Sequence, residues 1–138
     1  MKEIYDKILE YDDDGELWYF YGERETANLI ASKSIINWND VIDQIMSHGS
    51  LMVTRFLEAV SCIENDSIAN LISALVPICS DENLEDIFFM INDQLASKLN
   101  PEDLQIILMR TEKIYTNRPK NEGFMNTINC INRYLAEK

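Results

Sequence analysis

Apolar residues recur along most of this chain at intervals of three and four, the spacing of one face of an α-helix. The clearest example is residues 81–99. Ser80 and Asp81 at its start are typical helix N-cap residues, and acids fill the first turn, where the helix dipole favours them. This pattern predicts one helix over 81–99. Its apolar face consists of Leu84, Ile87, Phe88, Ile91, Leu95 and Leu99.

A second helix is predicted immediately afterwards, from residue 101 to about residue 115. Asn100 is a favourable N-cap residue, and Pro101 suits the first helical position, where its missing N–H is not needed. Two helices joined this closely should pack antiparallel. The apolar face of the second helix is Leu104, Ile107, Leu108, Thr111 and Tyr115.

The same periodicity predicts shorter helices along the rest of the chain. Gly49 should end one of them in the left-handed conformation, and Pro77 should weaken the last turn of another. Residues 17–22, which begin LWYFY, fit a helix and a short strand equally well, because aromatic residues also favour strands. The further predicted helices cover residues 3–11, 23–35, 39–48, 50–63, 66–79 and 121–136.

These elements predict an all-α fold, an array or bundle of roughly six to eight short antiparallel helices. Only three prolines and four glycines interrupt the chain, and no segment shows reliable strand alternation. The helix starts are spaced like stacked hairpins of the HEAT-like kind, although no consensus letters recur at a fixed spacing. With 138 residues, of which 46% are hydrophobic, the chain is expected to form one globular domain over 1–138.

Targeting signals and cysteines indicate the compartment. The longest apolar runs are far too short to span a bilayer, and acids occupy the N-terminus where a signal peptide needs an apolar core. Cys62, Cys79 and Cys130 show no CxxC spacing, so we expect buried thiols in a reducing cytoplasm. Thirteen asparagines and eighteen isoleucines suggest an AT-rich genome and favour a bacterial origin.

Charge narrows the class of partner. Twenty-four acids against twelve bases give −12, concentrated in residues 1–25 (−6) and 61–105 (−8), whereas residues 106–138 carry +3. Such a potential repels nucleic acid and anionic membranes and accelerates encounter with a basic protein. We therefore expect a basic protein partner, no nucleic acid and no membrane. Solubility alone is the other explanation of this charge.

The segment EYDDDGELWYFYGERE, residues 10–25, joins three aspartates and a glycine to an aromatic run. As an EF-hand loop aligned on Gly15 it fails, because Tyr21 occupies the twelfth position, where calcium needs a bidentate glutamate. It is then either an Asp-Gly turn into buried aromatics or a binding surface on which some rings, Tyr21 among them, stay exposed beside acids. The binding alternative predicts a partner-binding site of Asp12, Asp13, Asp14, Trp18 and Tyr19.

No constellation of residues indicates catalysis. The one histidine, His48, precedes Gly49 and is expected to interact with the last carbonyls of a helix. The sequence has no glycine-rich phosphate loop, no GxSxG and no histidine–cysteine cluster with metal-ligand spacing. We therefore expect no enzyme activity, no cofactor and no metal. An enzyme acting through scattered carboxylates would need a concave pocket with perturbed acids.

A helical wheel of residues 81–99 places acids on the side opposite the apolar face, around Phe89. Nothing on that face neutralises them, and like charges four residues apart cost a few tenths of a kcal/mol each. This arrangement favours a surface that binds lysine and arginine. The alternative is that Phe89 packs under a neighbouring helix. The acids in question are Glu82, Glu85, Asp86 and Asp93.

In its segments DDDGELWYFYGE and SDENLEDIFFMIND and in its overall profile, this small acidic helical chain resembles the immunity proteins of bacterial contact-dependent or polymorphic toxin systems. The resemblance implies a cytoplasmic, non-catalytic inhibitor of a basic, nuclease-type toxin domain. It also implies that the acids around Phe89 mimic substrate phosphates and pair with the toxin's lysines and arginines, while Phe89 anchors the contact. The rival interpretations are a helical-repeat adaptor that binds a protein or peptide in a groove, and a component of a larger complex.

Overall fold

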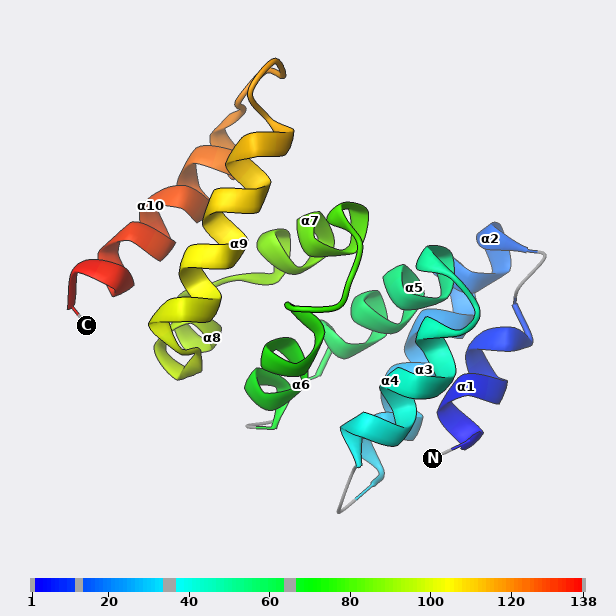
Figure 1. Cartoon of the computed structure of the whole chain (residues 1–138). Coiled ribbons are helices and arrows are strands. Elements are labelled where there is room, and N and C mark those ends of the chain that lie inside the picture. Colours follow the sequence, from blue (N-terminus) through cyan, green and yellow to red (C-terminus); the bar gives the residue numbers. More distant parts are fainter. Residues whose placement is uncertain (1, 12–13, 34–36, 64–66, 138) are drawn as a thin grey trace. The chain divides into compact units, whose positions relative to one another are not determined.

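The regular elements of the chain are helical. A computed structural model describes residues 2–11, 14–33, 37–63 and 67–137, and within these ranges every regular element is a helix and no strand occurs (Figure 1). The prediction of an all-α array or bundle of short helices is therefore confirmed. Asp12 and Asp13 of the predicted binding site lie outside the described residues.

The chain divides into two compact units, Met1–Asp66 (unit 1) and Ser67–Lys138 (unit 2). The units differ in charge. Unit 1 has fourteen acidic and five basic residues, net −9, whereas unit 2 has ten acidic and seven basic residues, net −3. The single domain over 1–138 and the HEAT-like stacking stay predictions.

Unit 1 consists of α1 (Lys2–Leu9), α2 (Gly15–Leu17), the π-helical turn η1 (Trp18–Gly22), α3 (Glu23–Ala31), α4 (Trp38–Met46) and α5 (Ser50–Val60). Its core lies where α1 and α5 each contact both α3 and α4. Ile4, Ile8 and Phe56 are fully buried there. The Trp38 ring meets Phe56 edge-on, with the ring centroids 6.1 Å apart. Aromatic rings thus fill the centre of the unit with the edge-to-face geometry that they prefer.

Capping residues determine where two helices of unit 1 begin. The Asn37 side chain accepts a hydrogen bond from the Asp40 N–H at 3.4 Å and caps α4. Gly49 precedes α5 with φ 107° and ψ 175°, a conformation that side chains disfavour. The prediction that Gly49 ends the preceding helix in the left-handed conformation is wrong: α4 is capped at Ser47, and Gly49 is the N-cap of α5 with a positive φ but a ψ outside the left-handed helical region.

Unit 2 consists of α6 (Ile68–Leu75), α7 (Asp81–Met90), α8 (Asp93–Lys98), α9 (Pro101–Ile114) and α10 (Glu122–Glu137). In this unit α9 packs against α7 and α10, and α8 contacts α6 and α10. The core holds a second aromatic cluster. Phe88 lies 5.1 Å from Phe124 between centroids, and Tyr115 stacks on Phe124 at 4.3 Å. The helix start predicted at Pro101, behind Asn100, is confirmed.

The single helix predicted over 81–99 is wrong, because two helices occupy this segment. Ile91 is extended, with ψ 124°, and it ends α7. The Asn92 side chain then accepts a hydrogen bond from the Leu95 N–H at 2.9 Å and starts α8 as a new N-cap. The apolar spacing continues across this break because both helices bury residues in unit 2. A single helical wheel therefore misplaces Asp93 relative to the acids of α7.

The thiols differ from the prediction. Cys79 is buried and Cys130 is half-buried, but Cys62 is exposed, so the expected burial of all three is wrong. Burial raises the pKa of each thiol above its ordinary value. A neighbouring carboxylate raises the pKa further at two of them: Glu23 acts on Cys62, and Asp93 acts on Cys130. No helix in the described ranges is both long and apolar enough to cross a bilayer.

Candidate partner-binding surface

Three of the acids predicted around Phe89 lie on α7, and the fourth, Asp93, lies on α8 and is exposed. Glu82 is exposed, whereas Glu85 and Asp86 are half-buried. Phe89 is 47% exposed, and its ring meets Phe88 at 5.0 Å and Tyr115 at 6.5 Å between centroids, both edge-on. Phe89 is therefore partly packed within unit 2 and partly available at its surface.

Arginines of unit 2 neutralise much of this acidic region. Arg118 lies 3.9 Å from Glu85, and Arg110 bonds Asp81 at 2.6 Å. On α8, Asp93 pairs with Arg133 of α10. The expectation that nothing neutralises these acids is therefore wrong. The sequence could not show it, because the partners are 29 to 40 residues away along the chain.

Tyr115 also satisfies Glu85. Its hydroxyl donates a hydrogen bond to Glu85 at 2.6 Å, and this bond raises the pKa of Tyr115 above its ordinary value. The Arg118 guanidinium lies 5.6 Å from the centre of the Tyr115 ring. Tyr115, Arg118 and Glu85 thus form a ring–arginine–carboxylate triad within unit 2.

The aromatic run of unit 1 is exposed to a greater extent than Phe89 of unit 2. Residues 15–31 form one right-handed helical path in which Trp18–Gly22 is a π-turn, because the Glu23 N–H donates to the Trp18 carbonyl five residues back. The choice left open for residues 17–22 is therefore settled as helix. Tyr19 and Phe20 are 67% exposed and Tyr21 is 58% exposed. We call Tyr19, Phe20 and Tyr21 the aromatic ridge.

Trp18 is not part of this surface. Its side chain is 0% exposed, which corrects the prediction that it contacts a partner. The indole N–H donates to Glu58 of α5 at 3.2 Å, and the Arg55 guanidinium lies 5.6 Å from the ring centre. Trp18 therefore fixes the base of the ridge to α5.

Gly22 allows this close packing. A Cβ atom at Gly22 would lie 2.6 Å from Trp18 Cε3 and 2.7 Å from Tyr11 Cδ2, closer than carbon atoms can approach. The Arg55 guanidinium also donates a hydrogen bond to the Tyr11 carbonyl at 2.6 Å. On its buried side the π-turn therefore packs against Tyr11, whose carbonyl is bonded to Arg55, and Trp18 lies close against Gly22.

Several acids lie close to the ridge in the sequence, and Glu58 contacts one of its rings. Asp14 accepts a hydrogen bond from the Leu17 N–H at 3.0 Å, and Glu16 is exposed. The Tyr19 hydroxyl donates to Glu58 at 3.3 Å, and the negative charge of Glu58 raises the pKa of Tyr19. Within the described ranges, no lysine or arginine forms an ion pair with Asp14, Glu16 or Glu23. Residues 14–25 contain four acids and one base, so the surface is negative.

Phe20 is the residue that the sequence analysis missed. Helical periodicity alone does not say which ring of this aromatic run faces the core. In the structure Trp18 and Gly22, four residues apart, lie on the buried side, and the three rings between them are exposed. The sequence sign that could have identified this surface is the run of three aromatic residues, 19–21, shortly after the acidic residues 12–14.

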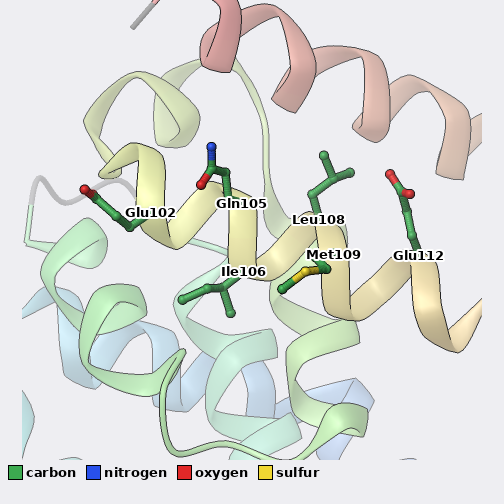
Figure 2. Close-up of a pocket in the computed structure, with 6 residues that line it drawn as sticks. All are labelled: Glu102, Gln105, Ile106, Leu108, Met109 and Glu112. Atoms are coloured by element: carbon green, nitrogen blue, oxygen red, sulfur yellow. The ribbon is translucent and has the colours of Figure 1, made fainter.

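A second apolar surface follows α9 in unit 2. A shallow hollow along this helix is lined by Glu102, Gln105, Ile106, Leu108, Met109 and Glu112. Figure 2 shows Ile106 and Met109 projecting from one side of α9 and Leu108 from the other. Met109 is 66% exposed, and Glu102 and Glu112 stand toward the two ends of the hollow.

The described residues include no group of three or more histidine, cysteine, aspartate or glutamate side chains placed to hold a metal ion. The His48 ring contacts Tyr5, whose hydroxyl lies 3.3 Å from Nδ1. Comparison with protein-family models, with curated proteins and with solved structures finds no match to this chain. The exposed aromatic ridge and the acids near it are the features from which function is argued below.

Proposed function

We propose that this protein is a non-catalytic, cytoplasmic immunity protein of bacterial origin that neutralises a basic, nuclease-type toxin domain through an acidic-aromatic surface. One observation supports this most strongly. Three consecutive aromatic side chains are exposed close in sequence to Asp14, Glu16 and Glu23, which form no ion pair with a described lysine or arginine, in the unit that carries −9. Exposed tyrosines and charge complementarity are what specific protein interfaces use.

The charge of unit 1 supports a basic partner. A net charge of −9 on 66 residues creates a field that draws a cationic domain in and repels nucleic acid. Close charge pairs across such interfaces couple by roughly 1.5–7 kcal/mol. A nuclease must bind phosphates with lysine and arginine, so its substrate cleft offers the complementary surface.

Inhibition then needs no chemical step. Carboxylates such as Asp14 and Glu16 pair with the basic groups that would otherwise hold phosphate, and the aromatic ridge covers the adjoining surface. Nucleic acid is excluded because the same cations cannot serve both partners. Of the acids first expected to act around Phe89, Glu85 and Asp93 have arginine partners within unit 2. A second contact through Glu82 and Asp86 stays a prediction.

The first test is genomic. We expect the gene upstream of this chain's gene to encode a large secreted protein with a basic C-terminal domain. That purified domain should cleave nucleic acid, and an equimolar amount of this protein should stop the cleavage. The dissociation constant of the complex should rise at least tenfold between 50 and 300 mM salt, as expected of an electrostatically steered complex. Unimpeded cleavage in the presence of excess protein would contradict the proposal.

The second candidate function is an adaptor that binds a peptide in a groove. The hollow along α9, with exposed Met109 and half-buried Ile106 and Leu108, favours it. An apolar contact of this kind depends weakly on salt. Met109→Lys should abolish binding to an adaptor's partner and leave toxin inhibition unchanged, so this one variant separates the two functions.

A further inference from the structure

We propose that the hollow along α9 docks an amphipathic helix of a partner protein, whose apolar side chains cover Met109 and whose basic side chains pair with Glu102 and Glu112 at the two ends. This surface belongs to unit 2 and does not involve the aromatic ridge, so it is independent of the toxin proposal. It names the chemistry of the peptide that the adaptor function would require.

The α9 helix carries apolar side chains on two sides. Leu104 and Ile107 are fully buried in unit 2. About half a turn around the helix from Ile107, the Met109 side chain is 66% exposed. Ile106 and Leu108 border Met109 and are half-buried (Figure 2). One exposed methionine would need no explanation, but three neighbouring apolar side chains that line one hollow form a contact surface.

Carboxylates mark the two ends of this surface. Glu102 and Glu112 are both exposed and line the hollow. Among the residues with described positions, neither forms an ion pair with a lysine or arginine. Glu112 follows Glu102 by ten residues, a separation of about 15 Å along a helix. A partner with two cations at that separation and apolar residues between them is complementary to this face.

A helix suits this face better than an extended peptide. Extended peptides gain affinity from backbone hydrogen bonds to the edge of a sheet. The backbone groups in the middle of α9 are bonded within the helix and cannot supply them. A partner helix satisfies its own backbone and needs only side-chain contacts. The flexible thioether of Met109 adapts to the side chains that it meets.

A second copy of this chain does not fit the same face. If two α9 helices paired antiparallel through it, Glu102 of one would approach Glu112 of the other. If they paired parallel, each glutamate would approach its own counterpart. Like charges would meet at both ends in either case, and the net charge of −12 on each chain adds to the repulsion.

The test uses three capped helical peptides built from alanine and glutamine, with leucines along one face. The first peptide has two lysines ten residues apart beside the leucine face. The second has the same composition with both lysines at one end, and the third has glutamates in place of the lysines of the first. Circular dichroism checks that their helicity is equal. Each is titrated into the full-length protein at 50 mM salt, and calorimetry gives the dissociation constants.

The expected order of affinity follows from charge and spacing. The first peptide should bind about three- to tenfold more tightly than the second, because only it can pair with both carboxylates at once. The third peptide should show no binding up to 1 mM. The advantage of the first peptide over the second should shrink at 300 mM salt, where exposed ion pairs are screened.

Three variants assign this binding to the hollow. Met109→Lys places a charge in the apolar centre and should abolish binding of the first peptide. Glu102→Gln combined with Glu112→Gln should retain binding but reduce the preference for the first peptide over the second to less than twofold. Met125→Lys is the matched control, because Met125 is an exposed methionine of unit 2 that does not line the hollow. Circular dichroism confirms that each variant is folded.

The proposal would be overturned by a wild type that does not bind the first peptide or does not prefer it to the second. It would also be overturned if Met109→Lys left the affinity unchanged, or if the preference survived the loss of both carboxylates. Sedimentation tests the other occupant: a wild-type dimer that Met109→Lys makes monomeric would assign the face to a second copy. None of these measurements involves a nuclease, so failure here leaves the toxin proposal intact, and failure of the toxin proposal leaves this surface intact.

Discussion

Unit 1 and unit 2 use acidic and aromatic residues in opposite ways. In unit 2, Arg110, Arg118 and Arg133 pair with carboxylates of α7 and α8, and the Tyr115 ring packs on Phe124 in the core. In unit 1, the aromatic ridge is exposed, and Asp14, Glu16 and Glu23 beside it in sequence form no ion pair with an arginine or lysine among the described residues. The same residue types thus stabilise one unit and face outward in the other.

This difference teaches that acidic composition alone does not locate an interface. Residues 61–105 carry −8 and looked as promising as residues 1–25, but three of their acids pair with arginines of the C-terminal part of the chain. Unpaired charge beside exposed rings is the more useful criterion for an interface. Unpaired like charges lower the stability of the fold, and exposed rings lower solubility, so neither is expected on a surface that binds nothing.

Replacing the two neighbours Trp18 and Tyr19 should give the largest contrast. Trp18→Ala removes a fully buried ring and its bond to Glu58, and it should destabilise the protein by about 3–5 kcal/mol. Tyr19→Ala removes an exposed ring and should cost no more than about 0.5 kcal/mol. Urea denaturation followed by circular dichroism measures both. Similar losses for the two variants would mean that the burial of Trp18 and the exposure of Tyr19 are not as described.

Two glycines allow the packing beneath the ridge to be tested. Gly22→Ala would force Tyr11 or Trp18 to move and should cost about 1–3 kcal/mol, the usual range for overpacking. Gly123→Ala in α10 is the control, because its Cβ would meet only Asn121 Oδ1 at 3.5 Å, and alanine favours a helix. Thermal melts of the two variants should therefore move in opposite directions. A stable Gly22→Ala variant would contradict the tight π-turn.

Removing tyrosine hydroxyls should show the difference in compensation. Tyr115→Phe loses the 2.6 Å bond to Glu85 and should cost about 0.5–1.5 kcal/mol. Tyr19→Phe loses a longer bond of 3.3 Å to Glu58 on an exposed side chain, and its effect should be smaller. Equilibrium unfolding of both variants under one set of conditions makes the comparison. A larger loss for Tyr19→Phe would reverse the ranking of the two contacts.

The smallest expected effect is a loss of folding stability in alkaline solution, caused by ionisation of Tyr11. The Tyr11 hydroxyl bonds Glu25 at 2.6 Å, which raises the pKa of Tyr11 to about 12 from its ordinary value of 10. The folded state then holds this proton more tightly than the unfolded state does. The resulting stability is fully present below pH 10 and is lost as the pH rises from 10 to about 12.

Ultraviolet titration of tyrosinate should show one late-ionising group that Tyr11→Phe removes. The pH dependence of unfolding between 10 and 12 should become shallower in the same variant. Glu25→Gln offers a matched control, since it keeps the phenol but removes the negative charge. A titration curve that Tyr11→Phe leaves unchanged would contradict the contact.

Much of the helical framework was readable from local chemistry. Asn100 and Pro101 fix the start of α9, and Ser80 caps α7 through its hydroxyl, which accepts from the Asn83 N–H at 3.2 Å. The break at Ile91 was missed because apolar spacing continues into α8. The sequence did contain a sign of the break: Asn92 and Asp93 are typical residues for the start of a new helix, and they interrupt the apolar pattern.

The binding surface was only half predictable. The acidic-aromatic segment drew attention to Asp14 and Tyr19, but whether Trp18 or Phe20 faces inward depends on what each ring meets in the folded unit. Local propensity does not encode that choice, which is decided by Gly22 fitting against Tyr11 and Trp18. The arginine pairs of unit 2 were equally invisible, since they join residues brought together only by the fold.

The two tryptophans give the protein a built-in optical label. Trp18 and Trp38 both belong to unit 1, and the sequence of unit 2 contains none. Indole emission therefore reports on one half of the chain, whereas far-ultraviolet ellipticity reports on helices in both. If the two signals lose their native values at different denaturant concentrations, the halves melt separately; if the curves superimpose, the chain unfolds as one cooperative body.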